Sequence, residues 1–229
     1  MRTIGLVGGI GPESTVDYYK QLLKRAPELG ATSAPVIVIN SVNFQRMYDL
    51  VAAGDPRKLA DAFVEEVRVL ERAGAGVGLL AANTPHIVFD AVQAQVSLPL
   101  VSIVTATAGV AAAQGLKRLG LLGTRFTMGG RFFPDVFGAR GMEIVAPDAA
   151  DLEYVHHKYV HELVPGTFLD ETRRGLAAVM ERLRTRAGVD GVILGGTELP
   201  LILRDVPFEL PLLDTTQIHV DAVLRAALS

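Results

Sequence analysis

Hydrophobic residues in this chain fall into short, β-branched runs, which alternate with longer stretches of helical spacing. Gly or Pro bounds most of the runs, a pattern typical of strand-helix units around parallel sheets. The predicted strands are residues 4–7, 36–40, 76–80, 98–101, 119–122, 142–146, 191–194 and 210–213. The predicted helices are residues 14–24, 59–72, 106–114, 152–163, 170–186 and 216–228. This order predicts an α/β fold.

The predicted strands form two matching sets. Three segments of the first half resemble three of the second half in the same order and at nearly constant separation: 4–9 with 119–124, 76–84 with 191–197, and 98–101 with 210–213. Internal similarity of this kind fixes architecture before any motif does. We therefore expect two pseudo-symmetric lobes, each a four-stranded parallel sheet flanked by helices, with a cleft where the lobes meet.

Turn and cap residues mark the ends of the predicted helices. Asp55 and Asp148 precede helices as cap or first-turn residues. Gly74, Gly115 and Gly188 follow helix ends, where a positive φ is often needed. These positions support the predicted boundaries.

Composition narrows the class of protein. Hydrophobic residues make up 49% and charged residues 21%, which is typical of a globular enzyme-like domain. The net charge is -3 and the cations are scattered, so nucleic acid is not an expected partner. The first predicted strand follows Met1 almost at once, and no apolar run approaches the roughly 20 residues needed to span a membrane, which together predict a cytoplasmic protein. The chain has no cysteine, which excludes disulfides and thiol nucleophiles.

Polar residues cluster where two equivalent strands end. Asn83 and Thr84 follow the strand at 76–80, and Thr197 follows the strand at 191–194. A side chain of Asn83 or Thr84, and that of Thr197, is expected to cap the next helix. Because ligands of parallel sheets bind beyond the carboxyl ends of the strands, two such helix starts would form a carboxylate receptor. The alternative is that both are ordinary strand-to-helix turns.

A glycine-rich turn, residues 8–12, follows the first strand. It lacks the third glycine of the dinucleotide fingerprint and the Gly-Lys-Ser/Thr of a nucleotide-binding loop, so no nucleotide cofactor is expected. Gly9 and Gly11 either let the backbone approach a small ligand or serve the turn alone.

Two further sets of polar residues invite a functional interpretation. Arg46 follows the second strand and is either a bidentate partner for a substrate carboxylate or an exposed arginine. His157 and His161 lie four residues apart with Glu153 one turn earlier, but no metal-binding spacing is present. We expect a solvated helix and no metal.

Residues 4–15, 83–86, 120–124 and 195–199 together resemble the aspartate/glutamate racemase superfamily, and most of all its aspartate racemase branch. The resemblance implies two α/β lobes, with residues 1–104 plus a returning C-terminal helix at 215–229 forming one lobe and residues 105–214 the other. It also implies a homodimer that needs no cofactor, binds a small amino acid or carboxylate, and moves a proton at the carbon α to the carboxylate.

The family moves that proton with one cysteine on each side of the substrate. The resemblance implies that these cysteines correspond to Ala82 and Gly196, so both acid/base groups are absent. Arg46 is similar to the arginine that holds the side-chain carboxylate in aspartate racemases. The residues whose family counterparts bind substrate are Asn83, Thr84, Thr124 and Thr197.

Replacement groups are few, because a methyl group or a hydrogen atom cannot accept a proton. The nearest side chains are His86, Glu198 and the hydroxyls of Thr84 and Thr197. Three interpretations stay open: a racemase-like isomerase or one-base relative acting on a small amino or dicarboxylic acid, a non-catalytic carboxylate-binding protein, and a variant in which natural thiols were replaced. If the pocket is otherwise intact, Ala82→Cys with Gly196→Cys is expected to create racemisation.

Overall fold

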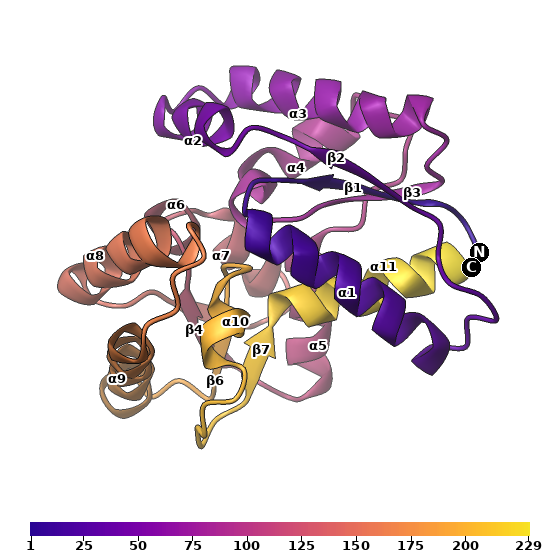
Figure 1. Cartoon of the computed structure of the whole chain (residues 1–229). Coiled ribbons are helices and arrows are strands. Elements are labelled where there is room, and N and C mark those ends of the chain that lie inside the picture. The colour runs from indigo at the N-terminus through magenta and orange to yellow at the C-terminus, as the bar shows by residue number, and fades with distance from the viewer. The chain divides into compact units, whose positions relative to one another are not determined.

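A computed structural model describes residues 1–229 and has the expected α/β fold, with parallel strands flanked by helices. The chain divides into two compact units (Figure 1). The first unit comprises Met1–Ile103 with His219–Ser229, and the second comprises Val104–Ile218.

The sheet of the first unit has three parallel strands in the order β2-β1-β3. They are β1 Ile4–Gly8, β2 Ile37–Ser41 and β3 Val77–Leu80. The expected fourth strand, residues 98–101, is only a single parallel bridge between Gly78 and Leu100. Pro99 lies in this segment and has no N–H to extend the ladder, so the pairing stops at two hydrogen bonds around Gly78.

Helices cover both faces of this sheet, as Figure 1 shows. They are α1 Pro12–Glu28, α2 Phe44–Ala52, α3 Pro56–Arg72, η1 Thr84–Val88 and α4 Phe89–Gln93, together with the part of α11 (Thr215–Leu228) from His219 onward. Val7 and Leu80 point into a core with Phe63 of α3, and Leu6 and Leu79 point into a second core with Leu22 of α1. Alternate strand residues therefore bury on opposite faces, as the two-residue period of a strand requires.

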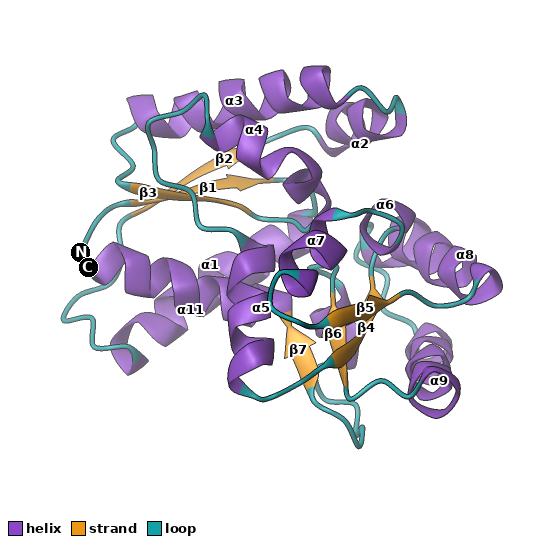
Figure 2. Ribbon diagram, turned by 180° about the vertical axis from the view of Figure 1, so that it is seen from behind, coloured by secondary structure: helices purple, strands orange, loops and turns teal.

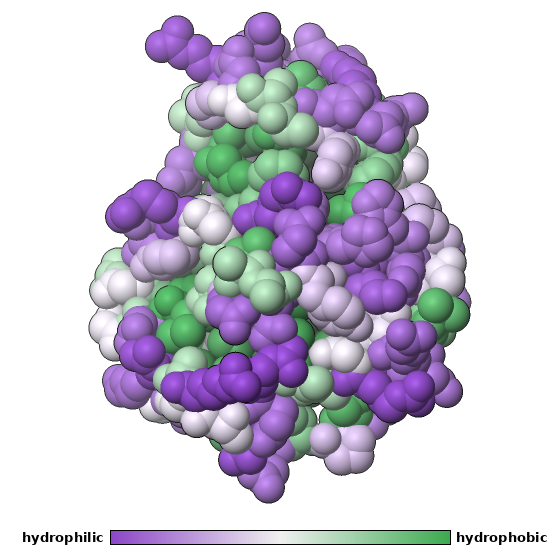
Figure 3. All heavy atoms as spheres, turned by 90° about the vertical axis from the view of Figure 1, so that its left-hand side faces the viewer, coloured by the Kyte–Doolittle hydropathy of each residue, from purple (hydrophilic) through white to green (hydrophobic).

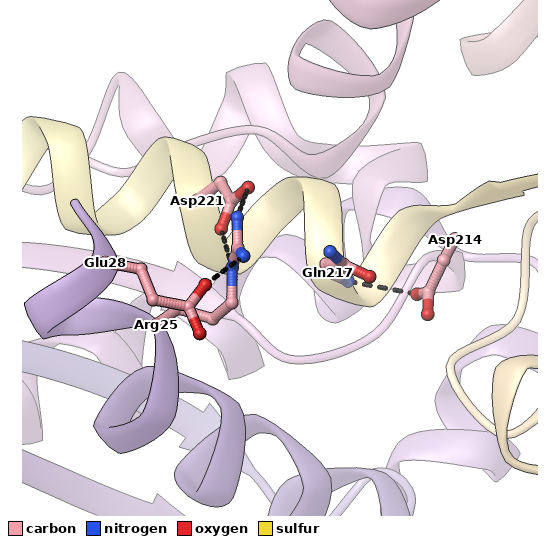
Figure 4. Close-up of polar contacts among 5 residues, drawn as sticks. All are labelled: Arg25, Glu28, Asp214, Gln217 and Asp221. Atoms are coloured by element: carbon pink, nitrogen blue, oxygen red, sulfur yellow. Dashed lines mark hydrogen bonds and ion pairs between the residues drawn. The ribbon is translucent and has the colours of Figure 1, made fainter.

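A charged contact holds α11 against α1 within the first unit. The Arg25 guanidinium donates from Nε to Asp221 Oδ1 at 2.7 Å and from Nη2 to Oδ2 at 2.6 Å (Figure 4). Such a two-pronged arrangement fixes orientation as well as attraction. Nearer the start of α11, in the second unit, Asp214 Oδ1 accepts a hydrogen bond from the Gln217 backbone at 3.0 Å, which caps the helix.

The second unit has a four-stranded parallel sheet in the order β5-β4-β6-β7 (Figure 2). Its strands are β4 Arg118–Leu122, β5 Glu143–Val145, β6 Gly191–Leu194 and β7 Leu212–Asp214. Its helices are α5 Ile103–Ala113, whose first residue closes the first unit, α6 Arg125–Met128, α7 Phe132–Gly138, α8 Ala149–Lys158, η2 Tyr159–Leu163, α9 Asp170–Ala187 and α10 Leu199–Leu203. All four expected strands of this half are present.

The predicted helix ends are confirmed at the punctuating residues. Asp55 accepts from two backbone N–H groups at the start of α3, and Asp148 accepts from Asp151 N at the start of α8. Gly74, Gly115 and Gly188 all have positive φ. The short helices α2, α6 and α7 were not predicted, because fewer than three turns give little periodicity to detect.

Polar side chains spread over much of the face drawn in Figure 3, with apolar atoms showing between them. Few large hydrophobic residues are exposed, among them Phe168 and Leu169. No helix combines the length and the hydropathy needed to cross a membrane.

Candidate active site

In the first unit, the chain turns sharply after β3. Ala82 and Asn83 are buried and Thr84 is half-buried. The expected side-chain cap is absent: Asn83 stands at the N-cap position of η1 without a side-chain cap bond. The reason is local, because Pro85 has no N–H and the His86 N–H already donates to the Asn83 carbonyl at 3.0 Å. The helix that follows is a 3₁₀ turn, not a long α-helix with a strong dipole.

His86 has both ring nitrogens engaged with the backbone. The Ile103 N–H donates to Nε2 at 3.2 Å, so Nδ1 carries the proton and donates to the Ala82 carbonyl at 3.1 Å. The ring stacks on Phe89 with centroids 4.9 Å apart. Burial, with a smaller contribution from His219, lowers the pKa of His86 to about 3. This geometry favours a structural role over that of a replacement acid or base.

Gly9, at the end of β1, is required by the turn itself. Its φ is +79°, and a Cβ there would lie 2.5 Å from the Val42 carbonyl oxygen. Its N–H donates to Thr15 Oγ1 at 2.9 Å, and Thr15 Oγ1 in turn donates to the Gly11 carbonyl at 2.8 Å. The turn therefore uses the Gly9 N–H internally, which favours the structural interpretation of this glycine.

Gly9→Ala is expected to lower the free energy of unfolding by about 2 kcal/mol, from left-handed backbone strain and the clash with Val42. Gly30 is the matched control, because its φ of +92° is also positive but its Cβ would meet no atom within 4 Å. Gly30→Ala should cost only about 1 kcal/mol. Urea unfolding of the two variants measures the difference, and equal losses would contradict the proposed clash.

Arg46 lies in the first turn of α2, after Asn43, whose side chain accepts from the Arg46 N–H at 2.9 Å. Its guanidinium is exposed and pairs with Glu66, with Nη1 3.1 Å from Oε1. Asn40 also donates to Glu66, at 2.8 Å. Arg46 thus already has a carboxylate partner inside its own unit, which favours the interpretation of an exposed surface arginine.

In the second unit, the turn after β6 is wholly buried. Thr197 and Glu198 are each 1% exposed. Thr197 is not the helix cap that its position predicted: Glu198 occupies the N-cap position of α10 without a side-chain cap bond. Thr197 Oγ1 instead donates to Glu198 Oε2 at 3.1 Å. The two side chains form a polar pair inside the lobe.

Tyr159, which the sequence did not single out, occupies the space beside Gly196. A Cβ at Gly196 would lie 2.3 Å from Cε2 and 2.9 Å from the hydroxyl oxygen of Tyr159. The Tyr159 hydroxyl donates to Glu198 Oε2. Burial first, and then the charge of Glu198, raises the pKa of Tyr159 well above its ordinary value. The one sequence signal for a neighbour such as Tyr159 was Gly196, because a side chain from another part of the chain must fill the space that a buried glycine leaves.

Thr124 begins the turn after β4. It caps α6, accepting from the Thr127 N–H at 3.2 Å. The Arg125 N–H donates to His156 Nδ1 at 3.2 Å, and burial lowers the pKa of His156. Two N–H groups at this helix start therefore bond within the second unit.

His157 and His161 are exposed on α8 and η2, with ring centroids 4.6 Å apart. No group of three or more His, Cys, Asp or Glu side chains is placed to hold a metal ion.

Within the first unit, the structure brings Ala82 and His86 together, and Gly9 and Gly11 share the turn after β1. Within the second, it brings together Gly196, Thr197 and Glu198 with Tyr159. The cleft that the sequence predicted where the two lobes meet stays a prediction.

Solved structures share this fold along the whole chain. A Yersinia pestis protein described as a candidate Asp/Glu racemase is 35% identical, with a TM-score of 0.88 and 100% of both chains covered. An aspartate racemase homologue from Pyrococcus horikoshii OT3 is 33% identical, with a TM-score of 0.84 and the same coverage. The fold is thus that of Asp/Glu racemase-like proteins.

Sequence comparison gives the family. The Asp/Glu/hydantoin racemase family matches residues 7–223, so the chain belongs to this family. The broad specificity amino-acid racemase RacX of Bacillus subtilis (strain 168) is 23% identical over 217 residues, which cover 93% of this chain and 92% of that protein.

Proposed function

We propose that this protein is a racemase-like isomerase, or a one-base relative of the racemases, that acts on a small amino or dicarboxylic acid without a cofactor. Family membership and the Asn83-Thr84 and Thr197-Glu198 turns support this proposal. The proposed substrate-binding positions are Asn83, Thr84, Thr124 and Thr197. The homodimer implied by the resemblance to racemases stays a prediction.

The observation that carries the proposal is the buried carboxylate of Glu198, which lies beside the position of a missing thiol and accepts hydrogen bonds from Thr197 and Tyr159. A site that only binds a carboxylate gains nothing from a second buried carboxylate, because like charges repel in a poorly solvated site. A carboxylate does supply what catalysis needs, which is a group able to accept a proton.

Solvent exchange tests the proposal. In D2O, the protein is expected to introduce deuterium at the α-carbon of at least one of D- and L-aspartate, D- and L-glutamate and small dicarboxylic acids. Proton NMR follows the loss of the α-proton signal, and chiral chromatography of the same samples reports any inversion. Glu198→Gln keeps the shape of the side chain but removes its basicity, so it should abolish the exchange.

The first unit favours one alternative, a non-catalytic carboxylate-binding protein, because position 82 carries only a methyl group and His86 is committed to the backbone. In that case, no substrate exchanges its proton while a dicarboxylate raises the melting temperature, since a ligand that binds the folded state stabilises it. Laboratory replacement of thiols is disfavoured, because the ring of Tyr159 already fills the space beside Gly196.

A further inference from the structure

We propose that Tyr159 takes the place of the missing cysteine of the second lobe and, paired with Glu198, is the proton-transferring group of this protein. The inference rests on the proposed function and adds to it a residue, a partner and a route for the proton.

The position of the Tyr159 hydroxyl is the first argument. It lies 2.9 Å from the point where a side chain at residue 196 would begin, so the phenol extends into the space that a cysteine side chain would need. Glycine is the one residue that leaves this space open. Gly196 has no side chain, and the phenol of Tyr159 fills the space that this leaves. An acidic O–H group therefore lies where the S–H group of the family's cysteine is missing.

The local backbone is the second argument. Tyr159 begins η2, a π-helical turn that directly follows the end of α8. π-helical turns are rare and occur frequently at functional sites. Here the turn presents Tyr159 to Glu198, 39 residues further along the chain.

The hydrogen bonds around Glu198 are the third argument. Tyr159 and Thr197 both donate to the same oxygen, Oε2, inside the lobe. Two donors stabilise the ionised carboxylate in a buried site. The pair thus holds a proton acceptor in contact with a proton donor.

In the proposed step, the Cα–H bond of the substrate breaks and its proton passes to the Tyr159 oxygen, while the Tyr159 O–H proton passes to Glu198 Oε2. The electron pair of the C–H bond stays on the substrate and is delocalised into its carboxylate. Glu198 becomes neutral, the substrate gains one negative charge, and the phenol is neutral before and after. Returning a proton, or a deuteron in D2O, along the same route restores both groups.

The raised pKa of Tyr159 fits this relay better than a phenolate base. Burial and the charge of Glu198 both disfavour a free phenolate at neutral pH. Coupled transfer avoids the phenolate, because the phenol loses one proton only as it gains another. A single proton-transferring group also predicts that α-deuteration runs faster than inversion.

Tyr159→Phe is the decisive variant, because it keeps the ring beside Gly196 and removes only the hydroxyl. We expect the rate of α-deuteration at saturating substrate to fall about 100-fold or more, with KM and the melting temperature little changed. Tyr18→Phe is the matched control: Tyr18 is also fully buried, and its hydroxyl donates to His219 Nδ1 at 2.9 Å, outside the proposed site. It should keep the wild-type exchange rate.

The outcomes separate the two proposals. If the wild-type protein exchanges no α-proton, the proposed function is wrong and the role of Tyr159 falls with it. If the wild-type protein and Tyr159→Phe exchange at similar rates, the proposed function stands and the role of Tyr159 is wrong. Equal losses in Tyr159→Phe and Tyr18→Phe would also overturn that role, because they would reflect general destabilisation.

Discussion

Gly196→Cys is expected to lower the free energy of unfolding by about 1–3 kcal/mol, and replacing Tyr159 with Ala in the same chain should recover part of that loss. The reason is overpacking. The new Cβ would lie 2.3 Å from Cε2 and 2.8 Å from Cζ of Tyr159, closer than such atoms can approach. The backbone φ of Gly196 is not in the left-handed region, so the cost is steric.

Urea unfolding of the wild type, both single variants and the double variant measures this coupling as a double-mutant cycle. Tyr159→Ala alone should be destabilising, because it leaves a cavity in the lobe. Ala82→Cys is the control, since residue 82 already carries a Cβ and its replacement adds only a sulfur atom. Additive effects of the Gly196 and Tyr159 substitutions would contradict the predicted clash.

The same clash changes what restoring the thiols should do. The sequence alone predicted racemisation from Ala82→Cys with Gly196→Cys. With Tyr159 in place, the cysteine at 196 has no room for its side chain, so this double variant should stay inactive as a racemase. Adding Tyr159→Ala should allow thiol-dependent inversion of aspartate or glutamate, read by chiral chromatography and lost after alkylation with iodoacetamide. Racemisation by the double variant alone would show that the ring moves aside.

Lowering the pH should begin to destabilise the protein at pH values well above those at which carboxylates titrate. Burial lowers the pKa of His86 to about 3 and that of His219 to about 4, against 6.5 for an ordinary histidine. Both rings are neutral in the folded protein at pH 7.5 and contribute nothing there. As the pH falls below 6.5, the unfolded chain binds protons that the folded chain cannot, so stability is lost. At pH 5, each histidine should cost about 2 kcal/mol, or about 4 kcal/mol together.

The buried position of His219 explains why it resists protonation. Its Nε2–H donates to the Val101 carbonyl at 2.8 Å, and Nδ1 accepts from Tyr18, so the ring has no site for a second proton. His219→Gln can keep a donor to Val101 but does not titrate. Its free energy of unfolding, measured by urea, should therefore fall by about 2 kcal/mol less between pH 7.5 and pH 5 than that of the wild type. His157→Gln removes an exposed histidine and is the control. An unchanged slope for His219→Gln would contradict the prediction.

Much of the fold was predictable, because strand and helix preferences act over a few neighbouring residues. The alternating burial of Leu6 and Val7, and the glycines that end the long helices, follow from local periodicity and φ alone. Internal similarity predicted two related lobes, and the turns at 83–86 and 195–199 led to the racemase family. The predicted strand at 98–101 was wrong because Pro99 limits its pairing to one bridge.

The sequence by itself determined the α/β fold, the family and the absence of cysteine, since these depend on residue type and order. Only the tertiary structure decided what the remaining polar residues can do. It committed His86 to two backbone partners and Arg46 to Glu66, and it brought Tyr159 into the space beside Gly196. The physical reason is that packing joins residues far apart in the chain, and no local pattern encodes which side chain fills the space that a glycine leaves.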